Sequence, residues 1–121
     1  MNKTRLCATV ALFSSAVTVL TMYALGFAAQ VKEVKLDNAR VKVTNVIYEP
    51  GVPRERYIRP TDQVIVFLDD CKYQRIDSKT GEKIVRERKS GEVLWHDKGE
   101  DAPVLINLGS KSYRTLVIEL K

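Results

Sequence analysis

Tyr57 and Arg59 stand two residues apart and combine a hydroxyl group with a permanent cation. On a β-strand this spacing points both side chains to the same face. A guanidinium there can pair in bidentate fashion with a carboxylate, phosphate or sulfate, and the tyrosine hydroxyl can add a donor. The pair therefore indicates a pocket for an anionic ligand. The alternative is that Arg59 pairs with Asp62 or reaches solvent, while Tyr57 fills the interior.

His96 is the one histidine of the chain and follows Trp95 close to a turn signal. The chain has no second histidine, and no cysteine is placed to help His96 hold a metal ion. As a general base it would need an orienting acid, for which Asp97 and Glu100 are sequence neighbours only. We therefore expect a structural or exposed His96. Trp95 is expected in the core or in a pocket wall, and the alternative is a stacking surface for a sugar or another ring.

Cys71 is the one cysteine outside the apolar leading segment, which contains Cys7. A single thiol cannot close an internal disulfide. No histidine or basic pair stands beside Cys71 in a pattern that would activate it as a nucleophile. We expect it to act as a small, buried or half-buried apolar residue.

Basic residues gather around one predicted hairpin and have a tyrosine among them, which on its own would suggest nucleic acid. Acids at Asp77, Glu82 and Glu87 interrupt the run, so a solvated hairpin of mixed charge is favoured and no nucleic-acid partner is expected. Contact with anionic lipid headgroups is expected only if residues 6–29 stay attached as an anchor. The basic residues are Lys72, Arg75, Lys79, Lys83, Arg86, Arg88 and Lys89, with Tyr73 between them.

Residues 1–28 form a separate, apolar leading piece. They include Lys3 and Arg5, contain no acid, and open an uncharged run of 24 residues from Leu6 to Ala29. A positive start, an apolar stretch and small residues at its end are typical of a secretory signal, and cleavage after Ala28 is expected. The run is also long enough to cross a bilayer, so an uncleaved N-terminal membrane anchor is the alternative. Both place residues 29–121 outside the cytoplasm, in the periplasm or the medium.

The remaining 93 residues read as short β-strands separated by turn signals, which is the pattern of an all-β sandwich or barrel. The stretch Asp77–Gly81 predicts a hairpin turn, and the more continuously apolar stretches 64–68 and 115–120 are candidates for the central core. The predicted strands are 31–36, 40–48, 63–68, 72–77, 82–88, 92–96, 103–107 and 113–120.

The order of strands and glycines resembles that of the cupins, small jelly-roll barrels with two sequence motifs. In the first motif a glycine precedes His-x-His and a glutamate. Here Gly51 opens that frame, Tyr57 and Arg59 stand at the two histidine places, and Gln63 stands at the glutamate place. The resemblance implies that these side chains line the mouth of a barrel.

The second cupin motif combines Pro-x-Gly, a histidine and an asparagine. Gly91 opens the matching frame, Gly99 stands for the Pro-x-Gly glycine, and Asn107 closes the frame. The histidine place falls on Ala102 or Pro103. Metal sites need imidazole and carboxylate donors, and the three histidine places and the glutamate place of the two motifs all lack them. The resemblance therefore implies a cupin scaffold without its metal, and no cofactor is expected.

We conclude from the sequence that an N-terminal signal or anchor helix precedes an all-β, cupin-like jelly-roll barrel over residues 29–121. The expected function is that of an exported, non-enzymatic module that binds a small anionic ligand or a protein partner. The expected ligand-binding residues are Tyr57, Arg59, Gln63 and Trp95. A homodimer formed through a sheet edge is a further expected partner. The alternative is a metal-independent cupin-type enzyme, a sugar epimerase or lyase.

Overall fold

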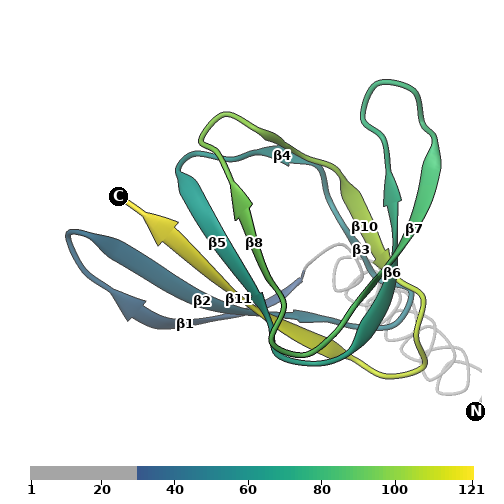
Figure 1. Ribbon diagram of the computed structural model, residues 1–121, viewed down its shortest axis with the longest axis horizontal. Helices are drawn as coiled ribbons and strands as arrows, with labels where there is room; N and C mark the ends of the chain where they lie inside the picture. Colours follow the sequence, from purple (N-terminus) through teal and green to yellow (C-terminus); the bar gives the residue numbers. More distant parts are fainter. Residues whose placement is uncertain (1–29) are drawn as a thin grey trace, which may run out of the picture.

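The computed structural model describes residues 30–121, and this part of the chain consists of eleven strands and no helix (Figure 1). The all-β prediction is thereby confirmed. The predicted signal or anchor segment lies outside the described residues. Within residues 30–121 there is no helix of the length and apolarity needed to span a membrane.

The larger sheet has five antiparallel strands in the order β1-β2-β11-β5-β8. Its central strand is β11, one of the two apolar strands expected there, and the other, β5, lies next to it. The edge strand β1 is exposed along its whole length, and within residues 30–121 it pairs with β2 alone. The strands are β1 (Val31–Asp37), β2 (Val41–Tyr48), β11 (Tyr113–Leu120), β5 (Asp62–Phe67) and β8 (Val93–His96).

The second sheet has four strands in the order β3-β10-β6-β7, and a two-stranded ladder β4-β9 lies beside the two sheets (Figure 1). The three strands that the sequence did not predict, β3, β4 and β9, have two residues each. So short an element shows no alternation of apolar and polar residues by which it could be recognised. These strands are β3 (Pro53–Arg54), β10 (Val104–Asn107), β6 (Cys71–Ile76), β7 (Lys83–Arg88), β4 (Tyr57–Ile58) and β9 (Asp101–Ala102).

The predicted hairpin turn between β6 and β7 is present. The carboxylate of Asp77 accepts hydrogen bonds from the backbone amides of Lys79 at 2.9 Å and Thr80 at 2.8 Å. Gly81 closes the turn with a φ of +74°, a conformation that residues with a Cβ rarely adopt. The hairpin therefore projects from one end of the four-stranded sheet as a defined element (Figure 1).

Aromatic rings hold the two sheets together. The rings of Tyr48 and Tyr113 stack at 4.7 Å, and those of Phe67 and Tyr73 lie parallel at 6.3 Å. Each pair supplies a large apolar contact area, and Phe67 and Tyr73 come from different sheets. The core therefore lies between the sheets, at the end of the barrel where these rings meet.

Trp95 does not lie in this core. Its side chain faces outward from β8 and is 53% exposed, and its indole nitrogen donates to the Asp97 carboxylate at 2.8 Å. Side chains alternate along a strand, and His96 takes the inward position opposite Gln63. The expectation that Trp95 fills the core or a pocket wall is therefore wrong.

Candidate ligand-binding cavity

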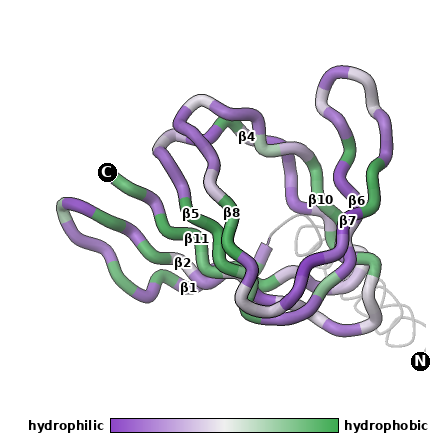
Figure 2. The backbone as a smooth tube through the Cα atoms, in the orientation of Figure 1, coloured by the Kyte–Doolittle hydropathy of each residue, from purple (hydrophilic) through white to green (hydrophobic). Residues whose placement is uncertain are grey.

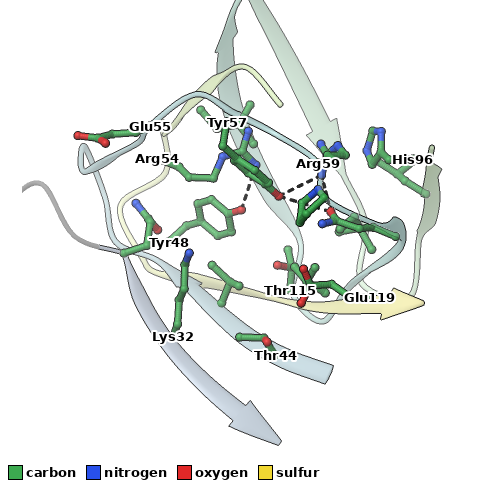
Figure 3. Close-up of a pocket in the computed structure, with 18 of the residues that line it drawn as sticks. Lys32, Thr44, Tyr48, Arg54, Glu55, Tyr57, Arg59, His96, Thr115 and Glu119 are labelled. Atoms are coloured by element: carbon green, nitrogen blue, oxygen red, sulfur yellow. Dashed lines mark hydrogen bonds between the residues drawn. The ribbon is translucent and has the colours of Figure 1, made fainter. Parts of the chain in front are cut away.

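A cavity of about 730 Å³ lies between the two sheets and changes character along its length (Figure 3). The strand register explains the change, because residues paired across a sheet point to the same side. The inward residues at one end of the larger sheet are polar, and those at the other end are aromatic. From the polar end, the rows across β2, β11, β5 and β8 are Lys42, Glu119, Gln63 and His96, then Thr44, Val117, Ile65 and Leu94, then Val46, Thr115 and Phe67, and finally Tyr48 and Tyr113.

The same gradient is visible along the backbone of β5 and β8 in Figure 2, where hydrophilic residues lie toward β4 and hydrophobic residues lie toward the opposite end. A ligand in this cavity meets hydrogen-bonding groups at one end and aromatic and aliphatic surface at the other. The cavity thus suits a molecule with a polar head and an apolar body, which is the usual composition of a small-molecule site.

Arg59 lies at the polar end and is buried, with 4% of its surface exposed. Its Nη1 atom donates to the Gln63 carboxamide oxygen at 2.7 Å and to the Tyr57 hydroxyl at 3.2 Å. Its Nε atom is buried without a hydrogen-bond partner, and the nearest carboxylate, that of Glu100, is 4.0 Å away. Burial lowers the pKa of Arg59, but a guanidinium stays protonated in proteins. The cation is therefore held in place without a close anionic partner.

Both alternatives considered for Arg59 from the sequence are wrong. Asp62 accepts a hydrogen bond from the backbone amide of Lys98 at 2.8 Å instead of pairing with Arg59. The guanidinium does not reach solvent, because backbone hydrogen bonds hold its segment against the loop that leads from β8 to β9. Arg59 N donates to Glu100 O at 3.0 Å, and Gly99 N donates to Arg59 O at 2.8 Å.

Tyr57 lies between two cations. Its ring centroid is 5.5 Å from the guanidinium carbon of Arg54 and 5.6 Å from that of Arg59, which is cation–π distance on both sides. Its hydroxyl donates to the Gln63 oxygen at 3.4 Å. Gln63 itself is 1% exposed. The structure thus brings together three of the four predicted ligand-binding residues, Tyr57, Arg59 and Gln63, and leaves Trp95 outside the cavity. Figure 3 shows Tyr57 and Arg59 next to each other in it.

His96 and Glu100, which the sequence presented as neighbours only, form a pair in the structure. The Nδ1 atom of His96 lies 2.7 Å from the Glu100 carboxylate, and His96 lines the cavity one strand away from Gln63. Burial, helped by the positive charge of Arg59, lowers the pKa of His96. The imidazole is therefore neutral near pH 7 and has a carboxylate to orient it. The i, i+4 spacing was visible in the sequence, but the turn that folds Glu100 back onto His96 was not.

The side chains at the metal-ligand places of the cupin frame do not fit a metal ion. Tyr57, Gln63 and the cation of Arg59 bond to one another, and Ala102 pairs with Tyr57 through the backbone and carries no donor. Metal sites in proteins draw on imidazole, carboxylate and thiolate groups. In the part of the chain that the structure describes, no three such residues gather into a group that could hold an ion.

Cys71 lies apart from these residues and is half-buried, with no disulfide partner in the described part of the chain. Burial raises the pKa of its thiol to about 11, so that little thiolate forms near neutral pH. This agrees with the expectation of a packing role.

Comparison with known proteins identifies the fold. No known family profile matches the chain, and no curated protein matches it by sequence. A cupin domain from Bordetella pertussis has a TM-score of 0.69 and 22% identity, and the match covers 77% of this chain and 94% of that domain. A protein with a double-stranded β-helix domain from Klebsiella pneumoniae has a TM-score of 0.57 and 17% identity, with 75% and 76% of the two chains covered.

A polyketide cyclase from Streptomyces resistomycificus has a TM-score of 0.61 and 16% identity, and the match covers 75% of this chain and 64% of the cyclase. These similarities show that the described residues adopt the small cupin-like fold that the sequence resembles. Because the sequence identities are this low, the similarities establish the fold only. The function has to be argued from the residues of the site.

Proposed function

We propose that this cupin-fold chain is an exported binding module that holds a small molecule by an acidic group, without using a metal. The observation that supports it is the environment of Arg59, a buried cation with an unpartnered Nε atom on the wall of a cavity. A buried charge without a close counter-ion is costly, and an anionic ligand would supply that counter-ion.

The rest of the cavity supports a ligand with an apolar body. Beyond the row that contains Gln63, the inward side chains are mainly aliphatic and aromatic, and they end at the stacked pair Tyr48 and Tyr113. The acidic head is therefore expected at Arg59 and Tyr57, and the apolar body toward the stacked tyrosines.

The test is a calorimetric titration of the exported protein with benzoate, octanoate, phenyl phosphate and inorganic phosphate. Saturable binding is expected for at least one probe, with an affinity at least about tenfold lower in Arg59→Met, since a charge-assisted hydrogen bond is worth roughly 1.5–3 kcal/mol. Arg40→Met removes an exposed arginine from the turn before β2 and is the matched control. Equal affinities in the Arg59 and Arg40 variants would contradict the proposal.

Export is the part of the proposal that rests on residues 1–28. Fractionation of expressing bacteria, followed by N-terminal sequencing, separates the two possibilities for this segment. A periplasmic or secreted protein beginning at Ala29 is expected if the segment is a signal, and a membrane-bound protein with an intact N-terminus if it is an anchor. Full-length protein in the cytoplasm would contradict export.

The second candidate is a metal-independent enzyme of the epimerase or lyase type, and the His96–Glu100 pair favours it. A neutral imidazole oriented by a carboxylate can remove a proton from carbon next to a carbonyl group. Incubation with hexuronates in D₂O tests this activity by mass spectrometry. Deuterium incorporation that His96→Gln abolishes would support the enzyme, and no incorporation by the wild type would count against it.

A further inference from the structure

A second cavity of about 610 Å³ lies between the β6–β7 hairpin and the segment that leads from β8 to β10. It adjoins the first cavity, because both are lined by Arg54, Arg59, His96 and Leu105. The second cavity is rich in arginine. Its cationic lining residues are Arg54, Arg56, Arg59, Arg75, Lys79, Arg86 and Arg88.

The strand register places three of these arginines in a continuous series. On the four-stranded sheet Leu105 pairs with Arg54 on one side and with Arg75 on the other. Neighbouring strands lie about 4.8 Å apart, so the backbones of Arg54 and Arg75 are about 10 Å apart on one face. Arg86 is opposite Tyr73 and therefore diagonal to Arg75.

The series continues into the barrel. Arg54 and Arg59 flank the ring of Tyr57, at 5.5 and 5.6 Å from its centroid. We call Arg59, Arg54, Arg75 and Arg86 the arginine series. It begins inside the first cavity at buried Arg59 and ends at exposed Arg86 on the hairpin.

The outer half of the series has no directly paired counter-ion in the described residues. Neither Arg75 nor Arg86 has an ion-pair partner among residues 30–121, whereas Arg88 pairs with Glu92 and Arg56 with Asp101. Within the first half of the series, the Nε atoms of both Arg54 and Arg59 are buried without a hydrogen-bond partner.

The acids that line the second cavity have other partners. Asp77 accepts the turn amides of the hairpin, which lower its pKa, and the charge of Arg75 contributes to that lowering without forming an ion pair. Asp101 binds Arg56 and the Ser78 hydroxyl, and Glu100 binds His96. Arg75 and Arg86 lie diagonally on one face of the β6–β7 ladder, within reach of long side chains, so an anion between them would relieve their mutual repulsion.

We infer that the ligand is a small molecule with two acidic groups, one bound at Arg59 and the other at Arg75 and Arg86. This inference rests on the proposed function for the acidic group at Arg59, and it places the chain between the two acids along the wall that both cavities share instead of toward Tyr48 and Tyr113. A dicarboxylate or a phosphorylated acid of sufficient length has this chemistry. The buried end of the series favours a small ligand over an anionic polymer, because only a terminal group reaches Arg59.

The experiment is a calorimetric titration of the exported protein with succinate, adipate, suberate and sebacate, each compared with the monocarboxylate of the same chain length. We expect at least one dicarboxylate to bind about tenfold more tightly than its monocarboxylate, as one added charge-assisted pair would give. The double variant Arg75→Met/Arg86→Met should reduce this dicarboxylate to the affinity of the monocarboxylate and leave monocarboxylate binding unchanged.

The matched control is Lys72→Met/Lys83→Met. It removes the same charge from the same hairpin, but from the opposite face of the β6–β7 ladder. Unchanged dicarboxylate affinity is expected there. Circular dichroism melting of each variant establishes that it is folded, and Arg75→Gln/Arg86→Gln replaces the methionine variant if that variant unfolds.

The outcomes separate this inference from the function on which it rests. If Arg59→Met abolishes binding but the Arg75/Arg86 variant binds the dicarboxylate as the wild type does, the second acidic group is refuted and the anion site at Arg59 stands. If Arg59→Met binds the carboxylates as the wild type does, or if no carboxylate binds the wild type, the anion site at Arg59 and the second acidic group are both refuted. An affinity for polyglutamate that rises with chain length, above that of every dicarboxylate, would refute the small ligand in favour of an anionic polymer.

Discussion

Arg59 donates from Nη1 to the carboxamide oxygen of Gln63 at 2.7 Å, in the interior of the barrel. Arg59 is the one buried charged side chain among residues 30–121, and its closest partner is a neutral amide. A neutral acceptor orients the guanidinium without cancelling its charge. The positive potential therefore remains available to an anion in the cavity.

Gln63→Glu would place a carboxylate where the ligand's acidic group is expected to act. We expect anion affinity to fall at least tenfold, about 1.4 kcal/mol, because the introduced group occupies Arg59. The free energy of unfolding at pH 7 should rise by about 1 kcal/mol, because a charge-assisted hydrogen bond replaces a neutral acceptor. Calorimetric titration and urea denaturation measure the two effects.

Gln63→Leu is the control for this substitution. It removes the amide without adding charge, so it should lower stability and leave Arg59 free for the anion. If Gln63→Glu binds the anion as tightly as the wild type does, the ligand does not use Arg59.

The titration of His96 is expected to make the free energy of unfolding depend on pH. Its pKa is lowered in the folded protein by burial and by the charge of Arg59, so below about pH 6.5 the unfolded chain binds a proton that the folded chain does not. Stability should therefore fall as the pH drops from 7, and this contribution should level off once the pH is below the folded pKa. Urea denaturation between pH 5 and pH 7, compared with His96→Gln, isolates the effect.

The variant removes the titrating group and should flatten the slope in this window. A slope that is identical in the wild type and in His96→Gln would show that another group is responsible. A directly measured His96 pKa above 6.5, from the titration of its ring protons by NMR, would also contradict the assignment.

Replacement of Asn107, which lies away from the charged groups of the cavity, is expected to lower the stability of the fold strongly. It is 3% exposed and makes three hydrogen bonds, to Tyr48 O at 2.9 Å, to Lys111 O at 2.8 Å and from Gly109 N at 2.8 Å. Asn107→Ala should cost about 3 kcal/mol, since each hydrogen bond is worth roughly 1 kcal/mol. Asn107→Asp should cost more, because it sets a carboxylate against two carbonyl oxygens.

Chemical denaturation measures both costs. Asn38→Ala is the control, since Asn38 also accepts backbone amides, those of Arg40 and Val41, but lies exposed. Its loss should cost about 1 kcal/mol or less. Similar costs at Asn38 and Asn107 would show that burial of the Asn107 network adds nothing.

The sequence predicted the features that depend on local spacing. Alternation along 40–48 indicated β2, and the two-residue spacing of Tyr57 and Arg59 placed them on one side. Gln63 came from the resemblance to the cupin frame. The cavity adds the reason that these three meet, because Tyr57 and Gln63 share the guanidinium of Arg59.

What the sequence did not predict depends on register and on turns. Along β8 both alternating sets contain an apolar residue, so the pattern could not tell whether Trp95 or His96 faces inward. The pairing of His96 with Gln63 decides it. The arginine series likewise exists because Leu105 pairs with Arg54 and Arg75 at once, although Arg54 and Arg75 lie far apart in the chain.

The most direct test of the central claim is to observe the Arg59 Nε–H group by ¹H–¹⁵N NMR while the ligand is added. The resonance is assigned by its absence from Arg59→Met, and that of Arg114, which already pairs with Asp69 at 2.9 Å, is the internal reference. Because Arg59 Nε has no partner in the free protein, we predict a saturable downfield shift at Arg59 and none at Arg114 when a bound carboxylate or phosphate probe is titrated. A bound probe that leaves the Arg59 resonance unmoved, or that shifts both resonances equally, would contradict the account.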